Sequence, residues 1–183
     1  MTDTKTPLLD YLTAFRKSSS HGHLLADATT QPARSARWAR TPLPLSAAVV
    51  EALARSGVER LYDHQAKGLE ATCSGEDLVV ATPTASGKSL VYQLAMLEAL
   101  ADDPGSRGLF LYPLKALAQD QLKGFRRLAE GMHPPPEAAI YDGDTPAAAR
   151  RRIRQLPPAV IFSNPEMLHL SLLAHHGAWA DFW

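Results

Sequence analysis

The sequence predicts an α/β fold with a mainly parallel sheet, preceded by a helical N-terminal extension. From residue 58 onward, short apolar runs alternate with longer segments that carry apolar residues at helical spacing. Continuous apolar runs are typical of strands buried on both faces, and strands joined by helices are parallel. The unusual polar residues follow the ends of these runs, where ligands bind in parallel sheets. We therefore expect three layers, with helices on both faces of the sheet.

The first 57 residues differ from the rest, and we expect them to form an extension of helical and extended segments. Apolar residues stand at helical spacing within residues 3–17. Ser46 can cap a second helix, which ends before Gly57. We place the domain boundary after residue 57, with the main domain at residues 58–183.

The elements of the main domain follow from hydrophobic period and from turn residues. Helical spacing predicts helices at residues 62–73, 88–100 and 115–130. Thr145 is expected to cap a further helix with Pro146 at its first position, and Pro165 to introduce a last one. The apolar runs predict strands at residues 77–81, 108–112, 138–141 and 159–162.

Composition excludes several classes of protein. The 183 residues are 45% hydrophobic and 21% charged, which is ordinary for a globular domain. Cys73 is the only cysteine, so neither an intrachain disulfide nor a cysteine zinc site can form. No signal-peptide pattern or membrane-length apolar run is present, and we expect a cytoplasmic location. The net charge is zero, yet residues 104–160 carry four excess positive charges, so nucleic acid stays a possible partner.

The strongest motif is the segment 81–89, Ala-Thr-Pro-Thr-Ala-Ser-Gly-Lys-Ser, between a predicted strand and a predicted helix. This layout is typical of a loop that binds nucleotide phosphates through backbone N–H groups at a helix N-terminus. Lys88 is expected to reach the β- and γ-phosphates, and Ser89 to bind Mg²⁺. The expected ATP-binding residues are Thr82, Pro83, Thr84, Ala85, Ser86, Gly87, Lys88 and Ser89. The alternative is a chance Gly-Lys-Ser in a surface turn, because Thr82 and Ala85 stand where many such loops have glycine.

Gln65 lies 23 residues before Lys88 and is a candidate for recognising the adenine base. A glutamine amide offers one donor and one acceptor, which match the N6 and N7 edge of adenine. Most helical glutamines are solvated, so only the position of Gln65 ahead of the phosphate loop favours this role.

Two strand-end segments have the composition of nucleic-acid contacts. Residues 112–121 and 163–168 each place polar side chains at a helix N-terminus, which suits a sugar-phosphate backbone. The expected nucleic-acid-binding residues are Pro113, Lys115, Gln119, Gly143, Asn164 and Pro165. An ordinary amphipathic helix with a solvated Lys115 is equally consistent with the spacing.

A third polar segment lies between them in the sequence, Tyr141-Asp142-Gly143-Asp144-Thr145-Pro146. Its two aspartates are better explained by a turn and a helix cap than by a metal pair. The arginines of residues 150–154 are interpreted as a solvated face rather than as phosphate contacts.

Together these stretches resemble the first RecA-like motor domain of superfamily 2 helicases. The residues of these motifs are similar to those of the DEAD/DEAH-box DNA helicases of the mitomycin-repair-factor and Hrq type, over residues 58–183. The resemblance implies a P-loop NTPase fold in which Gln65 reads adenine and Lys88 stabilises phosphate charge. It also implies that residues 113–121 and 163–167 contact single-stranded DNA. The implied activity is ATP-driven 3′-to-5′ DNA unwinding in repair, with Mg²⁺ as cofactor.

One departure from the family limits what this chain is expected to do. The family's Asp-Glu-x-His motif, which holds Mg²⁺ and activates water, does not occur in the 183 residues. We therefore expect the chain to bind ATP without efficient hydrolysis, and a second RecA-like domain to complete the motor. An RNA helicase and a P-loop kinase acting on a small molecule are the alternative functions.

Overall fold

The computed structural model describes residues 7–27, 29, 35–40 and 45–183. These residues belong to two compact units, and the division between them falls between residues 36 and 37 of the chain. In the first unit, helix α1 (Pro7–Lys17) is followed by the short 3-10 helix η1 (Gly22–Leu24). The apolar side chains predicted for this helix include Leu8 and Leu9, which are largely exposed.

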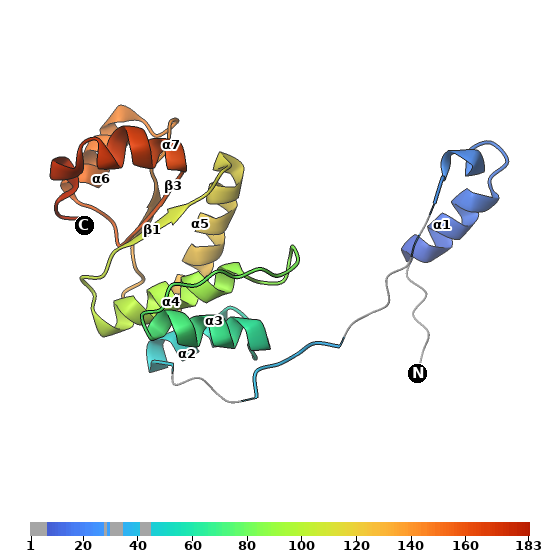
Figure 1. Cartoon of the computed structure of the whole chain (residues 1–183), viewed down its shortest axis with the longest axis horizontal. Coiled ribbons are helices and arrows are strands. Elements are labelled where there is room, and N and C mark those ends of the chain that lie inside the picture. Colours follow the sequence, from blue (N-terminus) through green and yellow to red (C-terminus); the bar gives the residue numbers. More distant parts are fainter. Residues whose placement is uncertain (1–6, 28, 30–34, 41–44) are drawn as a thin grey trace. The chain divides into compact units, whose positions relative to one another are not determined.

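The second unit contains the remaining elements (Figure 1). Its helices are α2 (Ala47–Arg55), α3 (Asp63–Cys73), α4 (Ser89–Asp102), α5 (Lys115–Ala129), α6 (Ala147–Gln155) and α7 (Pro165–Met167), followed by η2 (Leu168–Leu173) and η3 (His176–Trp179). Its strands are β1 (Gly108–Leu111), β2 (Ala138–Ile140) and β3 (Val160–Ser163).

The three strands form one parallel sheet in the order β1–β3–β2. In the register, Phe162 of β3 lies between Phe110 of β1 and Ile140 of β2. All three strands run in the same direction, so the segments that follow them gather at one edge of the sheet. The predicted α/β fold with a parallel sheet is confirmed.

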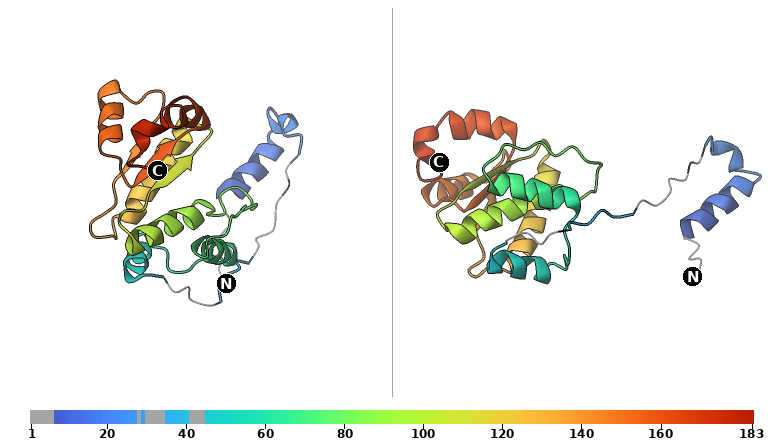
Figure 2. Two further views of the ribbon diagram at one scale, coloured as in Figure 1. Left: turned by 60° about the vertical axis from the view of Figure 1, so that its left-hand side comes forward. Right: turned by 60° about the horizontal axis from the view of Figure 1, so that its bottom comes forward.

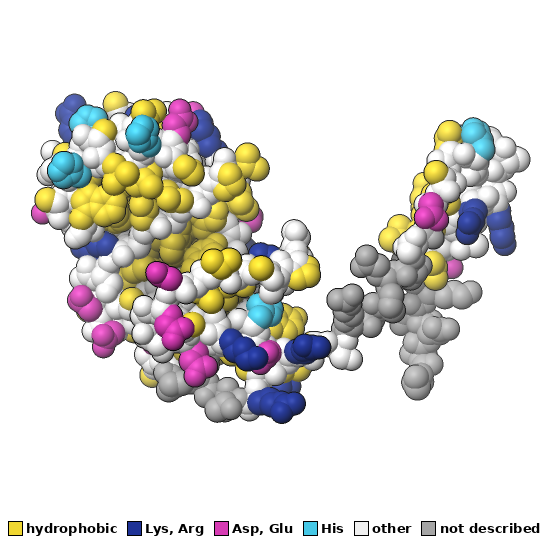
Figure 3. Space-filling view, in the orientation of Figure 1, with side chains coloured by type: hydrophobic (Ala, Val, Ile, Leu, Met, Phe, Trp, Pro, Cys, Tyr) yellow, Lys and Arg dark blue, Asp and Glu magenta, His cyan; other side chains and the backbone are white. Residues whose placement is uncertain are grey.

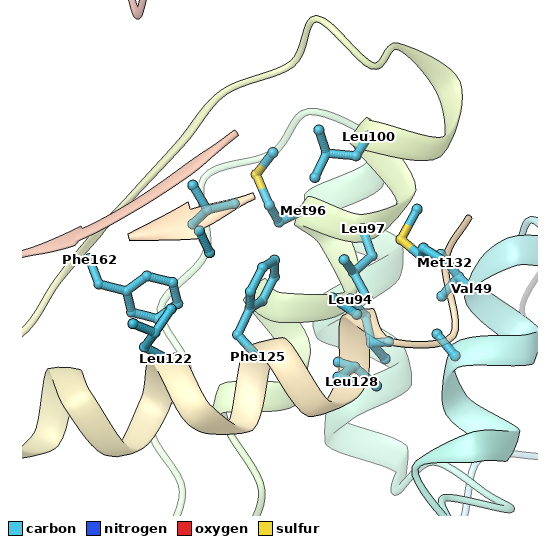
Figure 4. Close-up of a cluster of buried hydrophobic side chains, with 14 of the residues drawn as sticks. Val49, Leu94, Met96, Leu97, Leu100, Leu122, Phe125, Leu128, Met132 and Phe162 are labelled. Atoms are coloured by element: carbon cyan, nitrogen blue, oxygen red, sulfur yellow. The ribbon is translucent and has the colours of Figure 1, made fainter. Parts of the chain in front are cut away.

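The side chains of β3 alternate between two hydrophobic cores. Val160 and Phe162 face a core built with α2, α4 and α5, which Figure 4 shows in close-up. Ile161 belongs to a second core with Tyr141 and Trp179 on the opposite side. Figure 2 shows the corresponding layers, with α6 and the C-terminal helices across the sheet from α4 and α5. The expected three layers are thus present.

Helix α2 packs inside the second unit rather than in an extension. Ser46 caps it by accepting a hydrogen bond from the Val49 N–H, as expected, and Val49 and Ala52 are fully buried. Gly131, just after α5, lies so close to Ala52 that a Cβ there would be 2.3 Å from the Ala52 Cα. The structural boundary at residues 36 and 37 therefore differs from the one expected after residue 57, because periodicity does not reveal where a helix packs.

The predicted strand at residues 77–81 is wrong: this segment forms no ladder hydrogen bonds with the sheet. Val79 is 91% exposed and Leu78 is 42% exposed. An apolar run becomes a strand only where a neighbouring strand supplies hydrogen-bond partners. Figure 3 shows hydrophobic side chains gathered on the face of the second unit that is turned toward the viewer.

Helix α6 also begins later than expected, at Ala147. Thr145 does not cap it, because the Thr145 hydroxyl hydrogen-bonds to Asp142 instead. Pro146 occupies the N-cap position.

Within the residues that the structure describes, no helix is both long enough and apolar enough to cross a bilayer.

Candidate nucleotide and nucleic-acid site

The loop at residues 81–89 has the backbone of an anion-binding loop. Ala85 and Gly87 have φ angles of 60° and 77°, the left-handed conformation that turns successive N–H groups the same way. The N–H groups of residues 84–89 have no hydrogen-bond acceptor in the described part of the chain. Helix α4 begins at Ser89, so the positive end of its dipole lies directly behind the loop. Six unpaired donors at a helix N-terminus fit a polyphosphate.

Lys88 closes the loop on itself. Its Nζ donates to the carbonyl oxygens of Thr82 and Pro83, at 2.7 Å each. The hydroxyl groups of Thr82 and Ser86 are 2.6 Å apart. The Lys88 ammonium and these two hydroxyl groups are thus held within the loop. A phosphate that bound here would have to replace the two carbonyl contacts of Lys88.

Two side chains at the start of α3 brace this loop. Gln65 donates from Nε2 to the Gly87 carbonyl at 3.0 Å, and its Oε1 accepts from the Tyr62 N–H at 2.9 Å. Its neighbour His64 places Nε2 3.0 Å from the Ser86 carbonyl, to which it donates. Gln65 is 4% exposed, so both ends of its amide serve the protein in this structure. The contact of His64 with the loop was not predicted from the sequence.

A stack of aromatic rings adjoins these braces. Trp38 and Tyr62 stack with their ring centroids 4.6 Å apart, and Arg60 lies 5.1 Å above the Trp38 ring. Tyr62 in turn stacks on His64, with 5.8 Å between the centroids. An antiparallel bridge between Trp38 and Tyr62 ties the start of the second unit to the start of α3. Trp38 falls within the first 57 residues, which were expected to form an extension, and no role was predicted for it.

Buried polar groups join the start of α4 to the sheet and to α5. The Tyr92 hydroxyl lies 3.0 Å from that of Tyr112 and donates to Gln121 Oε1 at 3.2 Å. Burial, together with the hydrogen bond that the Tyr112 hydroxyl donates to Tyr92, raises the pKa of Tyr112, so its hydroxyl stays neutral. Tyr92 lies in the first turn after Ser89, and Tyr112 directly follows β1. The phosphate loop and the end of β1 therefore lie at the same edge of the sheet.

Three of the predicted nucleic-acid residues meet at this edge. Lys115 and Gln119, on the first turns of α5, line a pocket of about 360 Å³ together with Asp144. The Lys115 Nζ lies 2.7 Å from Asp144 Oδ2, and it would lie 3.5 Å from a Cβ placed on Gly143. The hydrogen bond that Lys115 donates to Asp144 raises the pKa of Lys115, against a smaller opposing effect of desolvation. Lys115 is thus a protonated donor beside Gly143.

The turn that carries Gly143 is held rigidly. Asp142 is 6% exposed, and its Oδ1 accepts from the Asp144 N–H and from the Thr145 hydroxyl, both at 3.0 Å. Arg150 of α6 donates to the carbonyl oxygens of the same turn. These contacts agree with the turn predicted for this segment, but the role of Arg150 was not foreseen.

Asn164 and Pro165 stand at the end of β3, and Pro113 at the end of β1. The Asn164 side chain accepts from the Met167 N–H at 2.8 Å, so it caps the first turn of α7. Ser163 donates to the Tyr141 carbonyl, and the Tyr112 N–H donates to the Ser163 carbonyl. The ends of the three strands are thereby linked, although Pro113, Asn164 and Pro165 do not line the pocket of Lys115.

The parallel sheet, with the loop of residues 81–89 at its edge, is the fold of a RecA-like domain. A family model described as DEAD/DEAH box helicase matches residues 62–181. The chain belongs to the DEAD/DEAH box helicase family.

Relatives and solved structures agree with this assignment. The uncharacterized ATP-dependent helicase YprA of Bacillus subtilis is 38% identical over 150 residues, which cover 82% of this chain and 20% of YprA. The ATP-dependent helicase HRQ1 of Saccharomyces cerevisiae is 37% identical over 155 residues, which cover 84% of this chain and 14% of HRQ1. The chain thus spans a fifth or less of the length of these relatives.

A crystal structure of the DUF1998 helicase MrfA bound to DNA is similar with a TM-score of 0.76 and 37% identity, over 81% of this chain and 21% of MrfA. The Mycobacterium smegmatis helicase Lhr bound to ssDNA and AMP-PNP is similar with a TM-score of 0.59 and 35% identity, over 70% of this chain and 18% of Lhr. The resemblance to mitomycin-repair-factor and Hrq-type helicases is confirmed.

Proposed function

We propose that this chain supplies the ATP- and DNA-binding part of the first motor domain of a DNA helicase. The observation that carries the proposal is the arrangement at one edge of the sheet. A loop with six unpaired N–H groups and a cluster around Lys115 lie at the same edge, linked through the Tyr92–Tyr112–Gln121 hydrogen bonds. The printed names of relatives add DNA as the nucleic acid for MrfA and ssDNA for Lhr.

In the nucleotide site, the loop N–H groups and Lys88 would hold the β- and γ-phosphates of ATP. Ser89 would bind Mg²⁺, which neutralises phosphate charge when present. The fit rests on the loop's unpaired donors and on the exchangeable carbonyl contacts of Lys88. Because Gln65 is bonded to Gly87 and Tyr62, we assign it first to holding the loop, and adenine recognition would require its second amide hydrogen or a changed rotamer.

In the nucleic-acid site, Lys115 and the backbone of the Gly143 turn would hold phosphates of a single strand. Gln119 would add an amide from the next turn of α5, and Pro113, Asn164 and Pro165 would extend the contact along the strand ends. Such contacts position a strand without reading its sequence. The complete protein would couple ATP turnover to unwinding, with 3′-to-5′ polarity and a role in repair as the family resemblance implies. It would include a second RecA-like domain and act in the cytoplasm.

Binding measurements with the 183-residue chain test this proposal. We expect a fluorescent ATP analogue to bind in the presence of Mg²⁺ and to lose affinity in Lys88→Ala. We expect fluorescein-labelled oligothymidylate to bind and to lose affinity in Lys115→Ala, with a shallower salt dependence, because one phosphate contact is removed. ATP turnover by the chain should stay at background, since no Asp-Glu-x-His motif is present.

The outcomes separate the alternatives. Tighter binding of oligouridylate than oligothymidylate would favour an RNA helicase. ATP binding without any affinity for either oligonucleotide would favour a small-molecule kinase. Turnover that disappears in Lys88→Ala would show that the chain carries its own catalytic carboxylate, contrary to the proposal.

A further inference from the structure

Arg150 differs from the other arginines of α6. Its Nε donates to the Thr145 carbonyl at 2.9 Å, and its Nη2 donates to the carbonyls of Asp142 and Gly143 at 2.8 Å each. Its guanidinium carbon lies 5.9 Å from the centroid of the Tyr141 ring. The guanidinium groups of Arg151, Arg152 and Arg154 have no hydrogen-bond partner in the described part of the chain. Arg150 is therefore engaged with the turn, while its neighbours form the solvated face that the sequence predicted.

These contacts, together with the Thr145 N–H that donates to the Asp142 carbonyl at 3.2 Å, fix the direction of a neighbouring N–H group. In a trans peptide the C=O and the N–H point in opposite directions. Because the Asp142 carbonyl points at Arg150, the N–H of Gly143 points away from Arg150. No acceptor for that N–H exists among the residues that the structure describes. The guanidinium has a rigid planar set of donors, which suits it to fixing several carbonyls at once.

The Lys115 ammonium lies beside the same turn. A Cβ on Gly143 would be 3.5 Å from the Lys115 Nζ, so the ammonium and the Gly143 backbone are immediate neighbours. Lys115 is paired with Asp144, which belongs to the same turn. The turn thus presents an unpaired backbone donor next to a cationic donor.

We propose that Arg150 is a positioning residue for nucleic-acid binding: it orients the Asp142–Gly143 peptide so that the Gly143 N–H and Lys115 together receive a DNA phosphate. The inference rests on the proposed function and names a group that acts through the backbone rather than on DNA itself.

The chain offers matched variants for the test. Arg150→Ala and Arg151→Ala remove the same charge from the same helix, but only the first removes hydrogen bonds to the turn. Arg150→Lys retains the charge and loses the planar set of donors. We expect Arg150→Ala and Arg150→Lys each to weaken oligothymidylate binding about tenfold, as for the loss of charge-assisted hydrogen bonds. Arg151→Ala should weaken binding about twofold or less, through long-range charge alone.

Two further readouts complete the experiment. The ¹H–¹⁵N resonance of Gly143, measured without any ligand, should shift in both Arg150 variants and remain in place in Arg151→Ala. Binding of the ATP analogue and the midpoint of thermal unfolding show whether the domain is still folded. Should Arg150→Ala fail to fold, Arg150→Lys and the Gly143 resonance carry the test.

Three results would overturn the inference. They are an unchanged Gly143 resonance in both Arg150 variants, equal binding losses in Arg150→Ala and Arg151→Ala, and full binding by Arg150→Lys, which would indicate direct phosphate contact. A wild-type chain that binds no oligothymidylate would instead overturn the proposed function, while the Gly143 resonance would still report whether Arg150 holds the turn.

Discussion

The side chain of Gln65 is hydrogen-bonded to the carbonyl oxygen of Gly87, with 3.0 Å between Nε2 and that oxygen. A Cβ on Gly87 would lie 2.4 Å from the same Nε2, so only glycine permits this approach. The glutamine that the sequence suggested as an adenine reader is therefore also a brace of the phosphate loop. The family resemblance predicts that Gln65 binds adenine, and the structure shows that its side chain holds the loop through Gly87.

We predict that Gln65→Ala destabilises the domain and weakens nucleotide binding. It removes two hydrogen bonds of a buried amide, and the expected cost is about 1–3 kcal/mol. Urea unfolding measures the stability, and titration with a fluorescent ATP analogue measures the affinity. Gln155→Ala, at the exposed end of α6, is the control and should change neither. An unchanged affinity of Gln65→Ala for the ATP analogue would argue against a role of Gln65 in holding the loop.

Ala85→Gly should stabilise the chain. Ala85 has a φ of 60°, a conformation that costs an L-residue about 1–2 kcal/mol. Glycine removes that strain but gains about 0.5–1 kcal/mol of unfolded-state entropy, so we expect a net gain of up to about 1 kcal/mol. The control Ala148→Gly, exposed on α6, should lose about 0.5–1 kcal/mol instead. Urea unfolding of both variants decides the sign.

Much of the local structure was predictable because it depends on near neighbours in the chain. The parallel strands and the Ser46 cap follow from apolar runs and from a hydroxyl ahead of a helix. The segment 77–81 was not predictable, because a strand requires hydrogen bonds from a partner that its own sequence does not name. The same holds for α2, whose apolar face fits an extension as well as a core.

The candidate site divides in the same way. Lys88 and Lys115 were found from their place at helix starts, which is a local signal. The contacts of Arg150 and His64 join residues whose pairing depends on turn geometry, and an arginine run looks like a solvated face in sequence.

Asp144→Asn should tighten oligothymidylate binding at low salt. In the structure Asp144 pairs with Lys115, so a DNA phosphate must displace it. Exposed ion pairs of this kind are weak, so we expect a gain in affinity of about two- to fivefold. The control Asp120→Asn, exposed on α5, should tighten binding less. Weaker binding by Asp144→Asn would show that Asp144 positions Lys115 rather than competing for it.

The pairing with Asp144 also sets a pH dependence. It raises the pKa of Lys115 above its ordinary value of 10.5, so the ammonium contribution is fully present below that pH. It is lost as the pH rises through the higher pKa of the folded protein. DNA affinity measured between neutral and mildly alkaline pH should accordingly show no step caused by Lys115.

Cys73 should react with iodoacetamide more slowly in the folded chain than in the unfolded one. Burial, with a smaller contribution from the Glu98 carboxylate, raises the pKa of the thiol, and the thiolate is the reactive form. The pH midpoint of alkylation should thus be higher for the native chain than in urea. Glu98→Gln keeps an acceptor for the Ser46 N–H and should lower the native midpoint. Equal midpoints in buffer and urea would contradict the expected effect.

Gly131→Ala tests whether α2 belongs to the motor unit. The added methyl group would lie 2.3 Å from the Ala52 Cα and 2.7 Å from its backbone nitrogen, so α2 must shift. We expect a loss of about 1–3 kcal/mol, as for overpacked cores. Gly124→Ala on α5 meets no atom within 4 Å and should gain about 0.5–1 kcal/mol. Thermal unfolding of the two variants measures both effects, and a neutral Gly131→Ala would mean that α2 is free to leave.

The second core has a practical consequence for anyone who shortens this chain. Ile161 and Tyr141 are fully buried, and the side chains that cover them include Trp179 and Phe182, close to the last residue. Deleting the final few residues would leave an aromatic and aliphatic surface bare on one side of a three-stranded sheet. We expect such a shortened chain to self-associate through this exposed apolar surface. Poor yield of a trimmed version would then reflect an uncovered sheet and carry no information about ATP or DNA.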